Sequence, residues 1–305
     1  NKIINDNTTG SVRQNLKFDT LEKIKIPLPS IEEQKQLIYE YNKKINLAGN
    51  QEKRAVELEN EIERYLFKKL KIKSNTSQSK SKGLNFVKFS KLNIWGADRL
   101  LRGGLNSLLK SNIFPMKKVS DLAYINPKTD ITKLDDESNM SFLPMRCISD
   151  TYGEVIFKEK GVKHKSNGYT KFFENDLIWA RITPCMQNGK SAIVSNLENS
   201  VGYGSTEFHV LRKKSENLSI RYLYHLLRTK SVRGDAVNYF TGSAGQQRVP
   251  KTYLENLFIP VPPFNIQNKI SDNINDLKSK IKHSRINAEK YKTNAIDSFE
   301  KEIFN

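Results

Sequence analysis

A thirty-residue segment near the start of the chain occurs again near its end, and this repeat constrains the fold more than any other feature. The copies read TGSVRQNLKFDTLEKIKIPLPSIEEQKQLI over residues 9–38 and TGSAGQQRVPKTYLENLFIPVPPFNIQNKI over residues 241–270. The second copy carries one additional residue after its Gly-Ser pair. The distance between the copies is too long for a solenoid unit. The repeat therefore indicates a duplicated module, and the residues between the copies belong to the second module.

The chain is strongly basic. Its 305 residues include 51 Lys and Arg against 33 Asp and Glu, which gives a formal charge of +18. Such an excess favours a polyanionic partner: DNA, RNA or an anionic membrane. The alternative is a solubilising surface or a coding bias toward lysine. No apolar run approaches the ~20 residues of a membrane span, and no signal-peptide pattern is present, so we expect no membrane association.

Cysteine and histidine usage predicts neither a disulfide framework nor a metal site. The cysteines are Cys147 and Cys185, too few for a framework, which indicates a reducing, cytoplasmic setting. The four histidines lack metal-ligand spacing. The chain begins at Asn1 inside the first module, so we expect it to be a fragment or a processed piece.

Each repeat copy leads into a long helix. Ser30 and Glu33 form a predicted capping box that opens a helix over residues 30–73, and Asn265 is expected to cap a second helix over 264–305. Apolar residues follow at heptad-like spacing. The expected seam residues are Ile38, Tyr41, Ile45, Ile62 and Leu66 in the first helix and Ile270, Ile274, Leu277, Ile281 and Tyr291 in the second. The simplest arrangement is an antiparallel intramolecular pair. In the alternative, each helix finds a different partner, for instance in a dimer.

The remaining segments predict one complete globular domain. Residues 1–29 resemble the tail of a first domain, residues 74–91 form a Lys- and Ser-rich linker, and residues 92–263 form a complete α+β domain with a mainly antiparallel sheet. Strands are predicted over 142–146, 154–157, 176–182, 191–195 and 207–211, and helices over 97–109 and 219–228.

Two segments of this domain carry a family resemblance. Residues 176–190 read DLIWARITPCMQNGK, and residues 202–212 read GYGSTEFHVLR. Together with the duplicated TGS…Q segments, they resemble the specificity subunit of type I restriction–modification enzymes. That family often shows an ITPC-x-x-NGK loop, a GSTEFHVLR strand and a TGS…Q…IP-P…Q segment before a long helix. All three marks occur here in the family's order, and the resemblance covers nearly the whole chain.

The resemblance implies a non-catalytic role in DNA recognition. Each target recognition domain of the family reads one half of a bipartite site in double-stranded DNA, and the two helices pair as a coiled coil that sets the gap. The subunit docks on two modification (DNA methyltransferase) subunits, and restriction or translocase subunits can join them. S-adenosylmethionine is expected on the methyltransferase, with no cofactor in this chain. The sequence departs from the family in carrying only the last part of a first recognition domain. It could therefore also be the C-terminal recognition region of a fused single-chain enzyme.

Amides and cations on turns are suited to reading bases, and clustered lysines to holding phosphates. The candidate base contacts are Arg181, Thr183, Gln187, Asn188 and Lys190 around an Asn-Gly turn, Tyr203 and Ser205 beside Gly202 and Gly204, and Gln246, Gln247 and Arg248 after the second Gly-Ser pair. The candidate phosphate contacts are Lys163, Lys165 and Lys171. For any one of these residues a structural role is the stronger expectation, and Glu207 is expected to belong to the sheet and core.

Enzyme classes fit the sequence poorly. The Val261-Pro262-Pro263-Phe264 segment lacks the amide that an adenine methyltransferase needs before its proline pair. The chain has no Walker motif and no dinucleotide fingerprint. The acidic run at residues 135–137 is typical of a solvated turn rather than a nuclease site.

Overall fold

The computed structural model describes residues 18, 22, 27–72, 108–243 and 245–304, which form two compact units. The helical unit contains the chain up to Ala55 and from His283 onward, and the sheet unit runs from Val56 to Lys282. The predicted linker, nearly all of the predicted first-domain tail and most of the helix predicted over 97–109 lie outside the described residues.

Two long helices dominate the chain: α3 (Ile31–Leu70) and α9 (Phe264–Phe304). The predicted capping box opens α3, because the Ser30 N–H donates to Glu33 Oε2 over 2.8 Å and the Glu33 N–H donates to Ser30 Oγ over 3.3 Å. Asn265 lies inside the helix rather than before it as predicted, although its Oδ1 does accept the Ile266 N–H of the first turn over 2.9 Å. The helix already begins at Phe264, and the Pro263 carbonyl accepts the N–H groups of Ile266 and Gln267.

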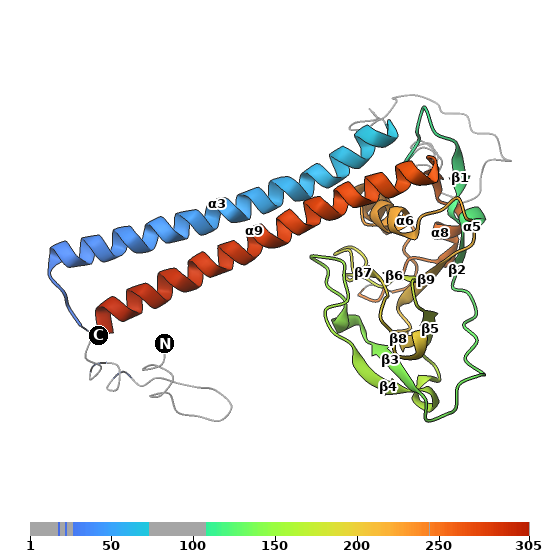
Figure 1. Ribbon diagram of the computed structural model, residues 1–305, viewed down its shortest axis with the longest axis horizontal. Coiled ribbons are helices and arrows are strands. Elements are labelled where there is room, and N and C mark those ends of the chain that lie inside the picture. The colour runs from blue at the N-terminus through green and yellow to red at the C-terminus, as the bar shows by residue number, and fades with distance from the viewer. Residues whose placement is uncertain (1–17, 19–21, 23–26, 73–107, 244, 305) are drawn as a thin grey trace. The chain divides into compact units, whose positions relative to one another are not determined.

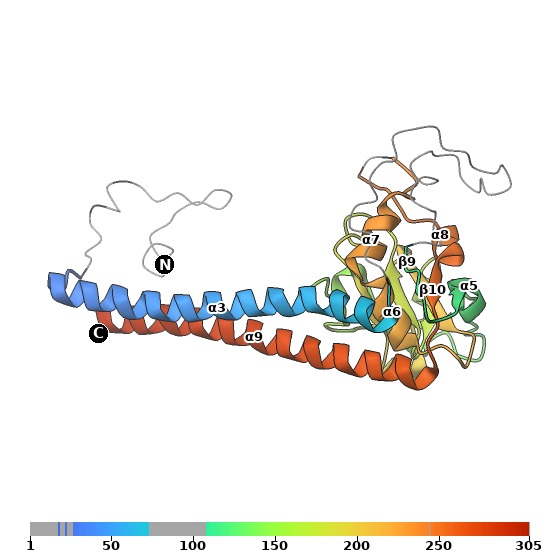
Figure 2. The same ribbon diagram turned by 90° about the horizontal axis from the view of Figure 1, so that it is seen from above.

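In the helical unit, α3 and α9 pair antiparallel, as the sequence predicts. The rings of Tyr41 and Phe299 meet edge to face at 5.6 Å between centroids, and Lys44 Nζ donates to Ser298 Oγ over 2.7 Å. Further along α3, Glu52 Oε1 accepts from Lys292 Nζ over 2.5 Å. Partner numbers fall along α9 as they rise along α3, and Figures 1 and 2 show the blue and red helices side by side.

Alanines fill the centre of the pairing seam. Ala48 and Ala55 on α3 are buried seven residues apart, and so are Ala288 and Ala295 on α9. Side chains this small let two helix backbones approach closely. The contacts of Tyr41 with Phe299 and of Lys44 with Ser298 lie beyond one end of this alanine row.

Nine of the ten predicted seam residues are buried or half-buried, and the exception is Ile38, whose side chain is 54% exposed. Alternating steps of three and four residues lead from Gln34 to Leu37 and Tyr41, so Leu37 takes the inward position and Ile38 falls beside it. The other predicted seam residues are buried or half-buried: Tyr41, Ile45, Ile62, Leu66, Ile270, Ile274, Leu277, Ile281 and Tyr291.

The sheet unit is built on two four-stranded sheets and one two-stranded sheet. Its strands are β1 (Met116–Lys118), β2 (Ala123–Ile125), β3 (Asn139–Leu143), β4 (Glu159–Val162), β5 (Thr170–Phe173), β6 (Leu177–Ala180), β7 (Ser191–Ile193), β8 (Val201–Gly204), β9 (Phe208–Lys213) and β10 (Phe258–Pro260). The strand orders are β2-β9-β6-β7, β4-β3-β8-β5 and β1-β10. Among the strands that the structure describes, every pairing is antiparallel except β3 with β8, so the mainly antiparallel α+β prediction is confirmed.

The strand predicted over 154–157 is wrong. This segment makes only an isolated bridge between Ile148 and Val155, and the next strand, β4, begins at Glu159. Alternation alone suggested a strand, but Ile156 and Phe157 are 60% and 46% exposed and pack on no core. The sequence also failed to predict β1, β2, β4, β5 and β8.

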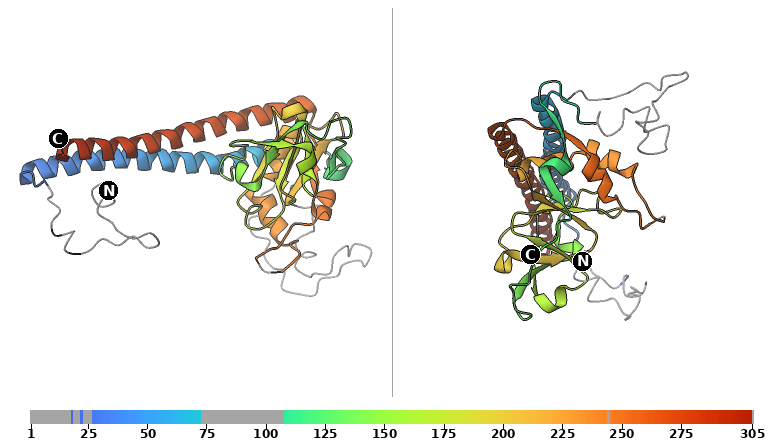
Figure 3. Two further views of the ribbon diagram at one scale, coloured as in Figure 1. Left: turned by 90° about the horizontal axis from the view of Figure 1, so that it is seen from below. Right: turned by 90° about the vertical axis from the view of Figure 1, so that its right-hand side faces the viewer.

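Short helices pack beside the sheets. They are α5 (Val119–Leu122), α6 (Ile220–Leu227), α7 (Lys230–Val237), α8 (Lys251–Asn256) and the 3-10 helices η2 (Met145–Cys147), η3 (Lys163–Ser166) and η4 (Glu198–Ser200). Helices α6 and α8 lie beside the strands in Figure 1, and Figure 3 gives two further views of the sheet unit. The largest core joins Leu66 and Leu70 of α3, Ile270 and Ile274 of α9, and Trp179 of β6.

Gln267 fastens α9 to the start of α6. It is fully buried, and its Oε1 accepts from the Ser219 N–H over 2.9 Å. Its Nε2 donates to Asn217 O over 2.7 Å and to Pro262 O over 2.8 Å. Nearby, Tyr222 Oη donates to Pro260 O over 2.8 Å. Across the described part of the chain, no helix is long and apolar enough to cross a bilayer.

Candidate nucleic-acid interface

Two polar loops that are distant in sequence form one surface of the sheet unit. The first loop is residues 181–190, and the second loop is residues 241–243 with 245–249. The Thr183 N–H donates to Gln247 O over 2.9 Å, and the Val249 N–H donates to Arg181 O over 2.8 Å. Isolated bridges pair Arg248 with Ile182 and with Thr241. The predicted groups on the two loops are therefore neighbours, as base-reading segments need to be.

The first loop contains a tight turn, and two arginines donate hydrogen bonds to its backbone carbonyl groups. The Asn188 N–H donates to Pro184 O over 2.9 Å, and Gly189 has φ of 84°, a left-handed conformation that favours glycine. Arg233 donates to the Gln187 carbonyl, and Arg228 donates to the Gly189 carbonyl. These contacts fix the backbone of the turn and leave the side chains of Gln187 and Asn188 exposed.

Thr183 and Lys190 serve the turn itself. The Thr183 hydroxyl donates to the Gln187 side-chain carbonyl. Lys190 Nζ donates to Met145 O over 3.1 Å, so its ammonium is engaged with the backbone of the domain. Of the five residues predicted around this turn, Gln187 and Asn188 are the two classed as exposed.

The second loop is organised by Arg248. Its Nε donates to Glu207 Oε2 over 2.9 Å, its Nη2 to Glu207 Oε1 over 2.7 Å, and its Nη1 to Gln246 O over 2.8 Å. The hydrogen bonds to Glu207 raise the pKa of Arg248, so the guanidinium stays charged. Gln246 is exposed beside it, and Gln247 is half-buried.

His209 anchors the base of the second loop. Its Nε2 lies 2.8 Å from Val249 O, and its Nδ1 lies 3.0 Å from Asn126 Nδ2. Burial lowers the pKa of His209 to about 4, so the ring is neutral near pH 7. A carbonyl can only accept, so Nε2 carries the proton and Nδ1 accepts from the Asn126 amide. The ring also stacks on Trp179, with 6.3 Å between centroids.

Sequence reasoning missed Glu207 and His209 as parts of this surface. It treated the histidine as ordinary and Glu207 as sheet and core. Glu207 is the turn residue immediately before β9, and His209 lies in that strand two residues further on. The close spacing of the two residues in the STEFHV stretch was the available signal. Their partners in the second loop, Arg248 and Val249, could not be predicted from the sequence.

Tyr203 and Ser205 have structural roles. Tyr203 is 3% exposed and stacks on Phe142 with 4.9 Å between centroids, so its ring is not available to DNA in this conformation. Ser205 Oγ accepts the Glu207 N–H over 3.2 Å. A Cβ added to Gly204 would lie 2.2 Å from Leu143 O, so this glycine admits strand β3 rather than a nucleic-acid backbone.

The three lysines predicted to contact phosphates differ in their surroundings, because two are hydrogen-bonded within the protein and one is exposed. Lys163 Nζ donates to Leu134 O over 2.5 Å and pairs with Asp136 at 3.1 Å, and Lys171 Nζ donates to Ser166 O over 2.9 Å. Lys165 is exposed, and Tyr169 close to it in the sequence is 44% exposed. Lys165 is therefore the best placed of the three predicted phosphate contacts.

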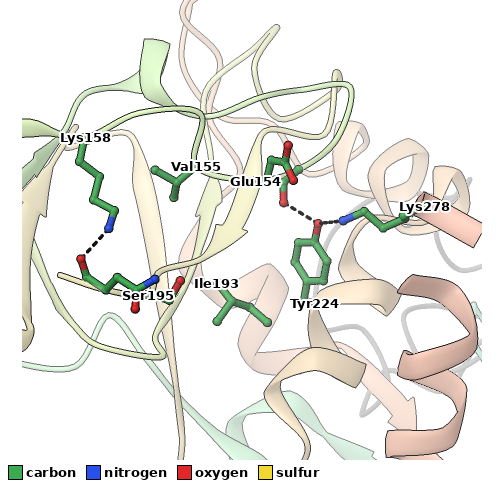
Figure 4. A pocket seen from close by; sticks show the side chains of 9 residues that line it. Glu154, Val155, Lys158, Ile193, Ser195, Tyr224 and Lys278 are labelled. Carbon is green, nitrogen blue, oxygen red and sulfur yellow. Dashed lines mark hydrogen bonds between the residues drawn. The ribbon is translucent and has the colours of Figure 1, made fainter. Parts of the chain in front are cut away.

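A cavity of about 320 Å³ opens in the sheet unit where the segment 153–158 and strand β7 meet α6 and α9 (Figure 4). Lys278 Nζ donates to Tyr224 Oη over 2.9 Å, Tyr224 Oη donates to Gly153 O over 2.6 Å, and Lys158 Nζ donates to Asn196 O over 2.5 Å. The Lys278 bond joins α9 to α6, and the Tyr224 bond joins α6 to the segment at Gly153, so the cavity lies at a structural junction. Among the described residues, no group of three or more His, Cys, Asp or Glu could hold a metal ion.

Comparison with protein families agrees with these features. The family model described as "Type I restriction modification DNA specificity domain" matches residues 1–44 and 114–289. The matched ranges contain both loops and most of α9.

Two Escherichia coli proteins are similar over half of the chain. The type I restriction enzyme EcoAI specificity subunit is 42% identical over 150 residues, which cover 49% of this chain and 25% of that protein. The EcoEI specificity subunit is 40% identical over 153 residues, covering 50% and 25%. The matched part is thus about a quarter of the length of these relatives.

One chain of a solved structure is similar in fold, and that structure is described as the basis of complex assembly and conformational transition of the type I R-M system. The TM-score is 0.51 at 11% identity, covering 90% of this chain and 59% of that one. At this identity the likeness concerns the fold alone.

Proposed function

Because this chain belongs to the type I restriction–modification DNA specificity family, we propose that it reads one half of a bipartite DNA site through its two polar loops. The observation that carries the proposal is the hydrogen bonding of the loops into one surface, through Thr183 with Gln247 and Val249 with Arg181. Family membership confirms the resemblance that the ITPC…NGK, STEFHVLR and TGS…Q motifs suggested. The role is DNA specificity without catalysis.

The chemistry of the exposed groups suits base edges in a major groove. Gln187, Asn188 and Gln246 present amides, which pair bidentately with adenine, and Arg248 is suited to guanine. Lys165 would hold a phosphate and fix the register of the protein on the duplex. The braced turn backbone supports this use, because preorganised donors lose little entropy on binding.

The helices supply the second half of the proposal. We propose that α3 and α9 set the separation between half-sites and dock two DNA methyltransferase subunits, which carry S-adenosylmethionine and methylate adenine. Restriction subunits would join the same assembly in the cytoplasm, where the DNA lies. The antiparallel pairing of Tyr41 with Phe299 and Glu52 with Lys292 supports a defined helix register. In this proposal residues 92–263 are the complete recognition domain.

Sequencing of methylated adenines in cells with and without this gene tests the function. We expect a bipartite methylation motif that disappears on deletion and returns on complementation. An unchanged methylation pattern would rule out a role in directing adenine methylation. A parallel titration of DNA binding against salt should show a steep loss of affinity, because phosphate neutralisation releases counterions. A flat salt response would instead indicate an interaction protein that does not bind DNA.

A further inference from the structure

One carboxylate serves two arginines at the meeting point of the loops. Glu207 accepts three hydrogen bonds from Arg248, at 2.7 to 3.0 Å, and its Oε2 lies 3.9 Å from Arg181 Nε. Arg181 Nε is buried and has no hydrogen-bond partner. The Arg181 N–H donates to Glu207 O over 2.8 Å, which fixes the backbone between the two charges. Glu207 thus balances two cations with a single negative charge.

This arrangement restricts what Arg248 can bind. The Glu207 carboxylate and the Gln246 carbonyl occupy its Nε, Nη1 and Nη2. These bonds engage three of the five N–H groups of the guanidinium. A phosphate that approached the other two would be repelled by the Glu207 carboxylate, whereas an uncharged base edge would not. Every DNA sequence offers phosphates, so a free arginine here would increase affinity for all sequences alike.

We propose that Glu207 is a specificity-determining positioning residue, which withholds Arg248 from non-specific phosphates and fixes the Gln246–Arg248 segment for contact with bases. The inference rests on the proposed function, DNA reading by the two loops. The carboxylate lowers affinity for random DNA and thereby raises discrimination, as repulsive elements do in other specific interfaces. Glu207 acts through Arg248 and does not itself contact DNA.

The test is the isosteric change Glu207→Gln in the full chain assembled with its modification subunits. Binding is measured to a duplex carrying the methylation motif and to a random-sequence duplex library, each across a salt series. We expect affinity for the random library to rise about tenfold, with a salt slope steeper by about 0.9 for one new phosphate contact. Affinity for the motif should change less, so discrimination falls. Adding Arg248→Gln to Glu207→Gln should remove the gain.

Glu216→Gln is the matched control, because it also removes one negative charge from the sheet unit. Glu216 is 94% exposed and pairs with Lys213 at 2.7 Å, outside both loops. A gain in random binding with Glu207→Gln but not with Glu216→Gln supports the proposal. Equal behaviour of the two variants would overturn it. So would a parallel loss of motif and random binding with a lower melting temperature, since that outcome marks a purely structural role.

Arg248→Gln alone gives a second test that does not require the Glu207 variant to fold. If Glu207 withholds Arg248 from phosphates, this change lowers motif affinity and leaves random affinity and the salt slope unaltered. Equal loss of both affinities would show that Arg248 already contacts phosphates and would refute the inference. Preference of the unaltered complex for its motif is established first, so a failure of the proposed function is recognised separately.

Discussion

Gln34 and Gln267 occupy equivalent positions in the two repeat copies and make the same hydrogen bond. Gln34 Nε2 donates to Pro29 O over 2.8 Å, and Gln267 Nε2 donates to Pro262 O over 2.8 Å. In each copy the donor lies five residues after the proline, at the start of a long helix. The duplication is therefore preserved in hydrogen bonding as well as in sequence. Each glutamine closes the turn that leads from the proline-rich segment into its helix.

Replacement of Gln267 should destabilise the sheet unit. Gln267→Ala removes bonds to three backbone groups, those of Ser219, Asn217 and Pro262, within a buried site. We expect the free energy of unfolding to fall by about 3 kcal/mol, because buried groups lose their partners. Urea unfolding monitored by tryptophan fluorescence measures the change. Asn265→Ala, at an exposed position of the same helix start, is the control and should cost far less. Equal effects of the two changes would contradict the role of Gln267.

A charge in the alanine seam should separate the paired helices. Ala295 is 1% exposed, whereas the neighbouring Ile296 is 48% exposed. Ala295→Lys forces a long cationic side chain into a closely packed seam, at a cost of roughly 1–3 kcal/mol. Hydrogen exchange should show lost protection over the helical unit. Ile296→Lys introduces the same charge one residue away and should leave protection unchanged. Preserved protection in both variants would refute the packing of α3 on α9 described above.

Stability should decrease in mild acid through His209. Its folded-state pKa of about 4 lies below the ordinary 6.5, so the unfolded chain binds the proton more readily. The stabilisation is complete above pH 6.5 and is lost as pH falls from there through 4, amounting to about 3 kcal/mol over the interval. Burial also lowers the pKa of His225, which adds in the same direction.

Urea unfolding at a series of pH values measures this dependence. His209→Gln should reduce the slope between pH 6.5 and 4, and His283→Gln, at an exposed position of α9, should not. An identical slope in the His209 variant would show that the ring is not neutralised by folding.

Removal of an exposed amide should relax base reading without unfolding the domain. Gln246 is exposed beside Arg248, and we expect Gln246→Ala to reduce discrimination by about 1–3 kcal/mol. Selection from a random duplex library, compared with the unaltered chain, should show one position of the half-site becoming degenerate. Gln36→Ala, at an exposed position of α3 outside both loops, is the control. An unaltered consensus with Gln246→Ala would remove this residue from the reading surface.

The long helices could be predicted because their determinants are local or repeated. Ser30 and Glu33 are three residues apart, and the capping box they form is a short-range contact. The inward position of Leu37 in place of Ile38 was missed, because both fit a helical period and only the partner helix distinguishes them.

The candidate site was harder to predict because tertiary contacts decide which polar side chains are hydrogen-bonded within the protein and which stay exposed. Lys190 and Lys163 look like DNA ligands in sequence, yet their ammonium groups bind the carbonyls of Met145 and Leu134. Tyr203 is buried where β8 pairs in parallel with β3, and no local sequence pattern predicts that pairing. Glu207 acquires its role from Arg248, forty-one residues away in the chain.

The alanine row in the helical unit lets the two helices approach closely but does not fix their register along the axis. Residues repeated every seventh position would match again after a slide of one heptad, about 10.5 Å along the axis. On a duplex that shift corresponds to about three base pairs. The bonds from Lys44 to Ser298 and from Lys292 to Glu52 would both break in such a slide. Small apolar residues thus decide how near the helices come, while a few polar contacts decide their alignment along the axis, which under the proposed function would set the separation of the half-sites.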